Sequence, residues 1–374
     1  MFLLESLQTM WGWLIPFLLV LTVLVFIHEL GHYLVARWNG VRVEVFSIGF
    51  GPALLSCMDR HGTVWKFSLI PLGGYVKMYG DANEASTPDA QAFLAMTDEE
   101  RALTLEGKSP LQRIFVSVAG PIANILLTFL LFSAVYMLQG KPSSLPIVGA
   151  LREEGVAAKS GVEVGDEIQS INGHTFSTFA ALQSFVMSRP NTQMSAVINR
   201  SGTLKTYAFV SGSQDISPRK KIGTIGVKPT LIRYSPVLAL REALFSIGDM
   251  TQRLLGLLKN IIVSGKGAQS LGSVLSIAKM SKDSFSEGIF PLLSFMAILS
   301  LNLGVINLLP IPMLDGGHIV FYLYEYIFGK PIPEKVLAWL YKTGFAVLIS
   351  VMLFTMWNDL MRFKVISTVV QLFK

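Results

Sequence analysis

The chain has 374 residues, of which 51% are hydrophobic and only 15% are charged, and its mean hydropathy is +0.52. This composition excludes an ordinary soluble globular protein and is typical of an integral membrane protein. Its single cysteine, Cys57, excludes an internal disulfide and a four-cysteine structural zinc site. The net charge of +6 comes from basic residues spread along the chain, which indicates membrane topology rather than nucleic-acid binding.

Residues 1–36 predict a first transmembrane helix that carries the pentapeptide HELGH. Residues four apart share a helix face, so His28 and His32 can both bind one metal ion, with Glu29 placed to act on a water molecule. Ionisable groups are costly in hydrocarbon unless they have a partner or a function. The alternative is a core helix of a soluble protein in which both histidines are merely hydrogen-bonded. The apolar sequence on either side of HELGH is too long for such a helix.

Residues 41–81 alternate apolar residues with glycines, which predicts β-hairpins beside the membrane. They form either a small cytoplasmic cap or a hairpin that dips toward the metal with its backbone groups satisfied, and we favour the second interpretation. Residues 111–138 predict a second transmembrane helix. No lysine or arginine precedes Arg37, whereas many lie between the first two spans, so the N-terminus is expected outside and this loop in the cytoplasm.

Residues 143–230 contain short alternating strands with turns at Asn172-Gly173 and Ser201-Gly202, which predicts a compact, mostly β domain on the extracytoplasmic side. Apolar residues recur at helical spacing in residues 234–283, with charged residues between them. This pattern predicts an amphipathic helical region that lies on the membrane surface or packs on the soluble domain.

Residues 289–317 predict a third transmembrane segment that ends in NLLPIPMLDGG. A carboxylate buried there needs a cation, and His28 and His32 leave a catalytic zinc ion one protein ligand short, so Asp315 is the expected third ligand. Two prolines should break the helix just before it. A proline-kinked span with a capping aspartate is the alternative.

A fourth transmembrane helix is predicted at residues 335–357. The expected fold is therefore a polytopic α-helical membrane protein with about four transmembrane helices, a membrane-associated β-hairpin loop and an inserted extracytoplasmic domain of mixed α/β, mostly β, structure.

HELGH in the first span and NLLPIPMLDGG in the third resemble the motifs of the site-2 protease family of intramembrane zinc metalloproteases, and the order of parts resembles the bacterial regulator-of-sigma-E protease type. The resemblance implies that His28, His32 and Asp315 bind zinc and that Glu29 is the catalytic base. It also implies that residues 41–81 form a membrane-reentrant loop that holds substrate, and that Asn307 lies beside the active site. An interhelical hydrogen bond is an equally probable role for Asn307.

Residues 155–173 resemble part of a bacterial PDZ domain, and the length of the region allows only one such domain. Residues 221–227 resemble its carboxylate-binding loop. The resemblance implies that Gly223, Thr224, Ile225 and Gly226 bind the C-terminus of a peptide.

The implied reaction is hydrolysis of peptide bonds within or near transmembrane segments of single-pass proteins, such as an anti-sigma factor or remnant signal peptides. An extended substrate is expected to bind beside Gly73, Gly74, Tyr75, Asn307, Pro310 and Pro312. The enzyme is expected in the bacterial cytoplasmic (inner) membrane, with lipid and membrane proteins but no nucleic acid as partners, and with its active site toward the cytoplasm. A transporter and a membrane-tethered PDZ adaptor are the rival classes.

Overall fold

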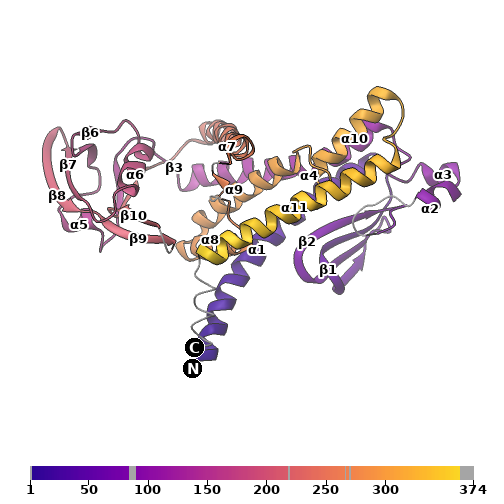
Figure 1. Ribbon diagram of the computed structural model, residues 1–374, viewed down its shortest axis with the longest axis horizontal. Helices are drawn as coiled ribbons and strands as arrows, with labels where there is room; N and C mark the ends of the chain where they lie inside the picture. Colours follow the sequence, from indigo (N-terminus) through magenta and orange to yellow (C-terminus); the bar gives the residue numbers. More distant parts are fainter. Residues whose placement is uncertain (1, 84–89, 218–219, 266, 269–270, 363–374) are drawn as a thin grey trace. The chain divides into compact units, whose positions relative to one another are not determined.

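The computed structural model describes residues 2–83, 90–217, 220–265, 267–268 and 271–362, and Figure 1 shows the order of their helices and strands. The chain divides into two compact units. One contains the described parts of 1–132 and 243–356, and the other those of 133–242 and 357–374.

Four helices of the described chain contain stretches long and apolar enough to cross a membrane. They are α1 (Phe2–Trp38), α4 (Pro110–Leu138), α9 (Ile289–Asn307) and α11 (Glu334–Arg362). The spanning stretch of α1 begins at Gly12. Each has the roughly 20 apolar residues that a bilayer requires. The predicted membrane fold with about four transmembrane helices is confirmed.

Strands β1 (Val43–Met58) and β2 (Val64–Met78) form an antiparallel hairpin of long strands interrupted by register shifts (Figure 1). Because both strands bend, residues 45–48 of β1 pair with residues 64–67 of β2 as well as with residues 74–77. Two strands thus fold into a small sheet. The short helices α2 (Ala90–Ala95) and α3 (Asp98–Arg101) follow it.

The hairpin is anchored on the C-terminal part of α1. Phe46 of β1 is fully buried, stacks on Trp65 with ring centroids 4.3 Å apart and meets Tyr33 of α1 edge to face. The carboxylate of Asp59, in the turn between the strands, accepts hydrogen bonds from the Tyr33 hydroxyl at 2.9 Å and the Trp65 indole at 3.1 Å. Aromatic packing and these charge-assisted hydrogen bonds therefore fix the hairpin to the helix that carries HELGH.

The distal half of the hairpin exposes a row of large apolar side chains. Leu55 is 72% exposed and Leu54, Phe67, Leu69, Ile70 and Leu72 also lie on the surface. An exposed apolar patch of this kind indicates contact with lipid or another apolar partner.

The amphipathic region forms two helices, α7 (Pro236–Ser264) and α8 (Val274–Glu287). Ser273 caps α8 by accepting a hydrogen bond from the backbone N–H of Leu275 at 3.2 Å. Ile277 of α8 packs against a buried cluster formed by α1 and α9, which includes Val20 and Leu292. In the first unit α8 therefore packs against the helix that carries HELGH.

The second unit holds the β-rich domain. The domain has a four-stranded sheet with the order β6-β5-β7-β8. It also has three separate two-stranded sheets, β9–β10, β4–β11 and β3–β12. The bounds are β3 (Lys141–Pro142), β4 (Val148–Leu151), α5 (Val156–Lys159), β5 (Glu167–Ile171), β6 (His174–Thr175), α6 (Phe179–Met187), β7 (Gln193–Arg200), β8 (Thr203–Val210), β9 (Gly212–Ser217), β10 (Lys220–Thr224), β11 (Val227–Pro229) and β12 (Leu231–Ile232).

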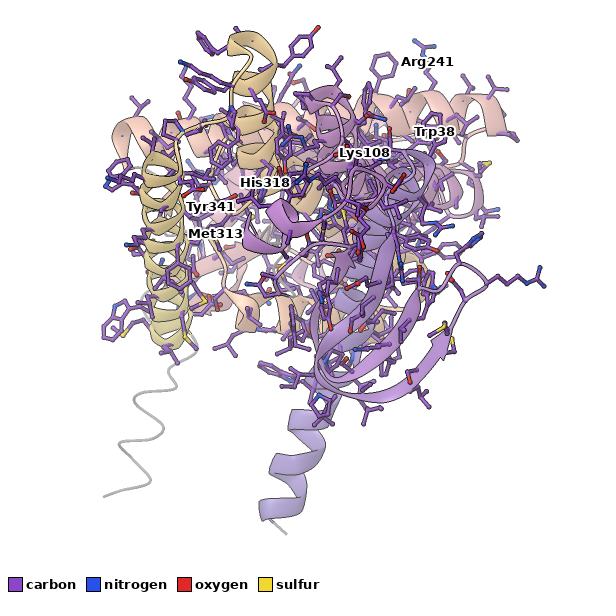
Figure 2. All side chains as sticks on the ribbon, turned by 90° about the vertical axis from the view of Figure 1, so that its right-hand side faces the viewer. Trp38, Lys108, Arg241, Met313, His318 and Tyr341 are labelled. Carbon is purple, nitrogen blue, oxygen red and sulfur yellow. The ribbon has the colours of Figure 1, made fainter. Side chains whose placement is uncertain are left out.

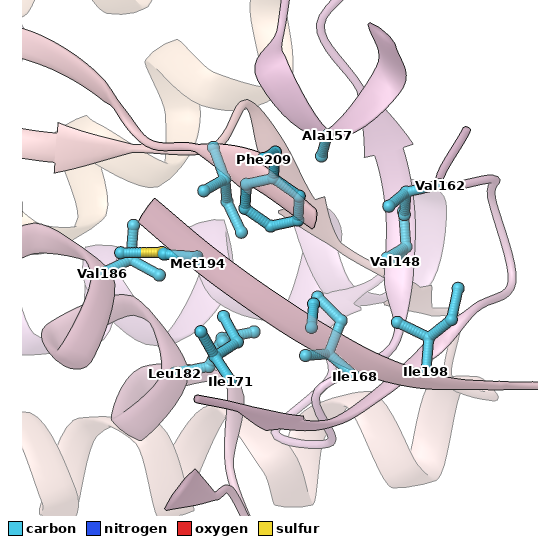
Figure 3. Packing of buried hydrophobic residues seen from close by; sticks show 12 residues of the cluster. Val148, Ala157, Val162, Ile168, Ile171, Leu182, Val186, Met194, Ile198 and Phe209 are labelled. Atoms are coloured by element: carbon cyan, nitrogen blue, oxygen red, sulfur yellow. The ribbon is translucent and has the colours of Figure 1, made fainter. Parts of the chain in front are cut away.

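This domain has its own core, shown in Figure 3, in which Ile171, Leu182, Met194 and Ile198 are almost completely buried. Beside it, the buried Asp166 carboxylate pairs with the Arg200 guanidinium at 2.8 Å. The hydrogen bonds from Arg200 outweigh the effect of burial and hold the pKa of Asp166 below its usual range. A separate core of this kind is what an independently folding domain requires.

Candidate metal centre

Three side chains from two distant parts of the sequence, α1 and the start of α10, meet at one point. The Nε2 atoms of His28 and His32 are 3.3 Å apart, and the Asp315 carboxylate oxygens lie 3.2 Å from His28 Nε2 and 3.4 Å from His32 Nε2. Among the described residues these three form the cluster able to hold a metal ion. All three are largely buried.

The spacing fits a tetrahedral zinc site. With zinc–ligand bonds of about 2.0–2.1 Å, two corners of a tetrahedron are about 3.3 Å apart. The two Nε2 atoms are separated by that distance, and a different oxygen of the Asp315 carboxylate lies within 0.1 Å of it from each of them. Two imidazole nitrogens and one carboxylate form a donor set that catalytic zinc uses, and three protein ligands leave the fourth position for water or substrate.

Helix α4 orients both histidines. The Nδ1 atom of His32 lies 2.8 Å from the backbone oxygen of Val116, and Nδ1 of His28 lies 3.2 Å from the side-chain amide of Asn124. Each ring thus has Nδ1 engaged and Nε2 directed at the cluster, the arrangement typical of metal-binding histidines. Sequence reasoning missed both partners. Asn124 had a signal, because it is a polar residue in the middle of an apolar span.

Asp315 begins a new helix rather than ending the third span. Helix α9 ends at Asn307, and α10 (Asp315–Phe328) starts with the carboxylate. The predicted break by Pro310 and Pro312 is therefore present, but the return to helix at Asp315 was not expected. Met313, just before it, adopts the left-handed φ of 82°. That conformation is unfavourable for a residue with a side chain and persists only where the surrounding structure imposes it.

Glycines allow the proline-containing loop to pack closely on α10. A Cβ atom on Gly316 would lie 2.2 Å from the Leu309 carbonyl oxygen, and one on Gly317 would lie 2.5 Å from that of Ile311. Across the loop, a Cβ on Gly344 of α11 would lie 2.4 Å from the Pro312 oxygen. Larger residues at these positions would move the loop, and with it the Asp315 carboxylate.

An ion-pair network holds α10 against α4. The buried guanidinium of Arg113 pairs with Glu325 of α10 and, at 3.0 Å, with Glu106, and it lies 4.8 Å from the ring centre of Tyr322. Burial raises the pKa of Glu106, although Arg113 opposes that effect. The helix that begins with Asp315 is thereby fixed to the helix that orients the histidines.

Glu29 is half-buried and lies within electrostatic range of His28, His32 and Asp315. Strand β2 approaches it closely: a Cβ atom on Gly74 would lie 3.2 Å from Glu29 Cγ and 2.9 Å from Val25 Cγ1. The structure therefore brings the hairpin, at Gly74, close to the side chain of Glu29. The other two residues of β2 that the sequence predicts to bind substrate flank Gly74. Gly73 has a positive φ of 132°, and the buried ring of Tyr75 stacks on Phe50.

Asn307 also reaches the cluster, with its side-chain nitrogen 3.4 Å from His28 Nε2. His318, by contrast, lies outside the cluster, although it is close to Asp315 in sequence. Its ring is among aromatic rings, including that of Tyr341 at 5.9 Å, and both are labelled with Met313 in Figure 2.

The expected peptide-binding residues of the β-rich domain belong to the second unit. Gly223 and Thr224 end strand β10 rather than forming a loop, and Gly223 is buried with α6 so close that a Cβ would lie 2.1 Å from the Val186 oxygen. Ile225 is buried in the core and its carbonyl accepts a hydrogen bond from Ala157 N–H. Thr224 and Gly226 are half-buried.

Comparisons with known proteins bear on this site. The model of peptidase family M50 matches residues 16–351. Two relatives named provisionally as zinc metalloproteases are 36% identical over 360 residues (Agrobacterium fabrum; 93% of this chain and 96% of the relative) and 39% identical over 361 residues (Mesorhizobium japonicum; 93% and 98%). The metalloprotease MmpA of Caulobacter vibrioides is 33% identical over 391 residues (96% and 98%).

A solved PDZ domain from the SdrC-like protein of Listeria monocytogenes is similar to 25% of this chain, with 92% of its own length covered, 16% identity and a TM-score of 0.20. At that score the assignment of residues 143–230 as a PDZ domain stays a prediction from the sequence.

Proposed function

The chain belongs to peptidase family M50 and is a membrane zinc metalloprotease, and on that premise we propose that His28, His32 and Asp315 bind the zinc ion and that Glu29 is the catalytic base. The observation that carries the proposal is that the Nε2 atoms of His28 and His32 are 3.3 Å apart and that each has an oxygen of the Asp315 carboxylate at 3.2–3.4 Å, separations close to the edge of a zinc tetrahedron.

The chemistry that a bound zinc ion would supply here is polarisation of the scissile carbonyl and a lower pKa of the attacking water. Glu29 then takes the proton from that water and passes it to the nitrogen of the leaving amine. Its position one residue after His28 supports this role, because the side chain projects beside the ligands rather than among them. Asp315, as a zinc ligand, takes no part in this proton transfer.

The proposed substrates are peptide bonds within or near transmembrane segments. A helical segment hides its backbone groups, so it must become extended before cleavage, and those groups then need new hydrogen-bond partners. The proposed partners are the backbone groups of Gly73, Gly74 and Tyr75, and the nearness of Gly74 to the side chain of Glu29 supports this role. Asn307 at the end of α9 lies against His28, and the loop with Pro310 and Pro312 joins α9 to α10, which begins at Asp315. These positions support a role for the three residues in binding substrate.

We further propose that the exposed apolar half of the hairpin enters the membrane and that residues 41–81 form a reentrant loop. Membrane-spanning helices on either side of it and side chains such as Leu55 on its surface support this placement. Charge distribution favours an active site toward the cytoplasm and a β-rich domain outside the inner membrane.

Single-pass proteins already trimmed by another protease, such as an anti-sigma factor, and remnant signal peptides are the proposed physiological substrates. In this proposal the β-rich domain, as a PDZ domain, binds the new C-terminus of such a fragment through residues 223–226. Because Gly223 and Ile225 are packed within the domain, binding there would depend on backbone groups near Thr224 and Gly226.

The test is a Glu29→Gln variant of the full chain, expressed in cells that lack the native enzyme. We expect it to retain zinc and to accumulate uncleaved membrane fragments, which proteomics of the membrane fraction would identify. A matched Asp249→Asn variant removes an exposed carboxylate of α7 that pairs with Arg253, and it should cleave normally. Normal cleavage by the Glu29→Gln variant would refute the assignment of the base.

A further inference from the structure

Asn124 of α4 reaches a proposed zinc ligand with its side chain, and sequence reasoning gave it no role. It is completely buried in the spanning part of α4, and its side-chain nitrogen lies 3.2 Å from Nδ1 of His28. A buried amide in a membrane helix is costly unless it is hydrogen-bonded. Its contact with His28 therefore requires an explanation.

The amide orientation conflicts with zinc binding. A histidine that binds zinc through Nε2 carries its proton on Nδ1, so Nδ1 is then a donor. In the structure this atom faces the Asn124 amide nitrogen, which is also a donor. The Asn124 oxygen, meanwhile, has no hydrogen-bond partner among the described residues. The nitrogen and oxygen of an amide have nearly the same shape, so their assignment depends on the hydrogen bonds available.

We infer that Asn124 is a positioning residue whose side-chain oxygen accepts a hydrogen bond from Nδ1–H of His28. A flip of the Asn124 side-chain amide exchanges its oxygen and nitrogen, so that the oxygen faces Nδ1 of His28. The flip removes the conflict between two hydrogen-bond donors. His32 already has an equivalent acceptor, the Val116 carbonyl oxygen at 2.8 Å. Both proposed histidine ligands would then donate to acceptors on α4.

The backbone around Asn124 is held firmly enough for this role. Its carbonyl oxygen accepts hydrogen bonds from Ser300 Oγ of α9 at 2.8 Å and from Thr128 Oγ1 at 3.0 Å. Thr128 Oγ1 also lies 3.1 Å from the Ala297 oxygen, and both hydroxyl-bearing side chains are fully buried. These bonds join α4 to α9, the helix that ends at Asn307. An acceptor fixed in this way holds the ring orientation and makes Nε2 a stronger metal ligand.

This inference rests on the proposed function, because it takes His28 as a zinc ligand. The test measures zinc affinity of the purified full-length protein in detergent, by competition with a chromophoric chelator, for Asn124→Asp and Asn124→Leu. Aspartate keeps the acceptor, whereas leucine has a similar size and no acceptor. We expect leucine to weaken zinc binding about 10- to 100-fold. Aspartate should bind zinc as tightly as the wild type or more tightly.

Wild-type affinity in the leucine variant, or an equal loss in both variants, would overturn the inference. If the leucine variant does not fold, the aspartate variant still decides, since an amide that donated its N–H could not be replaced by a carboxylate. His28→Ala separates the two levels of the proposal. Unchanged zinc affinity in His28→Ala would refute the assignment of His28 as a ligand. If His28→Ala loses zinc affinity and Asn124→Leu does not, only the role of Asn124 is refuted.

Discussion

Replacing Gly120 with alanine should remove zinc from the protein without unfolding it. Gly120 lies on α4 directly against His32, and a Cβ atom there would lie only 2.2 Å from His32 Nε2. Ordinary contact between such atoms requires about 3.5 Å, so the imidazole must move by more than about 1 Å. A zinc–ligand distance tolerates about 0.2 Å, so the site would lose one of its three protein ligands. Loss of a residue that only hydrogen-bonds to a zinc ligand lowers zinc affinity by up to about 100-fold. Displacement of a ligand itself should cost more, so we expect zinc affinity to fall by at least about 100-fold.

Zinc content of the purified protein by mass spectrometry and chelator competition measures this change, and thermal unfolding in excess chelator checks the fold. Gly12→Ala is the matched control, because Gly12 is at the start of the spanning part of α1 and a Cβ there would have no neighbour within 4 Å. Gly12→Ala should leave zinc binding unchanged. A Gly120→Ala protein that binds zinc like the wild type would refute the geometry, since His32 Nε2 could not then be the ligand atom in this position.

Three further predictions concern the surroundings of the site. Gly74→Ala should push β2 away from Glu29 and lower kcat/KM by about 10- to 100-fold with zinc content unchanged, because sub-ångström misplacement of substrate is costly; equal activity would argue against a substrate at Gly74. Hydrogen bonds outweigh burial and hold the pKa of Asp59 well below its usual range, so its stabilisation of the hairpin is complete above about pH 4 and is lost as the pH falls further. The protection factors of residues 43–78, which compare their hydrogen exchange with that of an unstructured peptide at the same pH, should therefore fall in acid in the wild type but be low at every pH in Asp59→Asn. Arg113→Met leaves the half-buried carboxylates of Glu325 and Glu106 without their cation and should cost about 1–3 kcal/mol of unfolding free energy, seen as a lower melting temperature; an unchanged melting temperature would show that the network is solvated.

The sequence predicted the parts of the molecule whose signal is local or chemical. The i, i+4 spacing of His28 and His32 predicted two ligands, and the cost of an unpaired carboxylate in a span identified Asp315. The comparisons confirm the family, the zinc cofactor, the class of enzyme and the membrane fold. The roles of the individual residues stay predictions, and the geometry supports those of His28, His32 and Asp315 most directly.

What the sequence did not predict depends on contacts between helices. Nothing in the periodicity of α4 says that Val116 and Asn124 face the histidines, or that Gly120 is small because His32 lies against it. The restart of helix at Asp315 depends on close packing of the loop against Gly316. Likewise, the helical spacing of apolar residues at 247–261 predicted one amphipathic helical region over residues 234–283, whereas the structure has two helices, α7 and α8, the second capped by Ser273.

Zinc stoichiometry of the Asp315→Ala variant tests the central claim most directly, because Asp315 comes from a distant part of the chain and completes the site with His28 and His32. Asp249→Ala, which removes an exposed carboxylate of α7, is the matched control. We predict about one zinc ion per chain in the wild type and the control, and a large loss of zinc and of proteolysis in Asp315→Ala. A full complement of zinc in Asp315→Ala would contradict the proposed site.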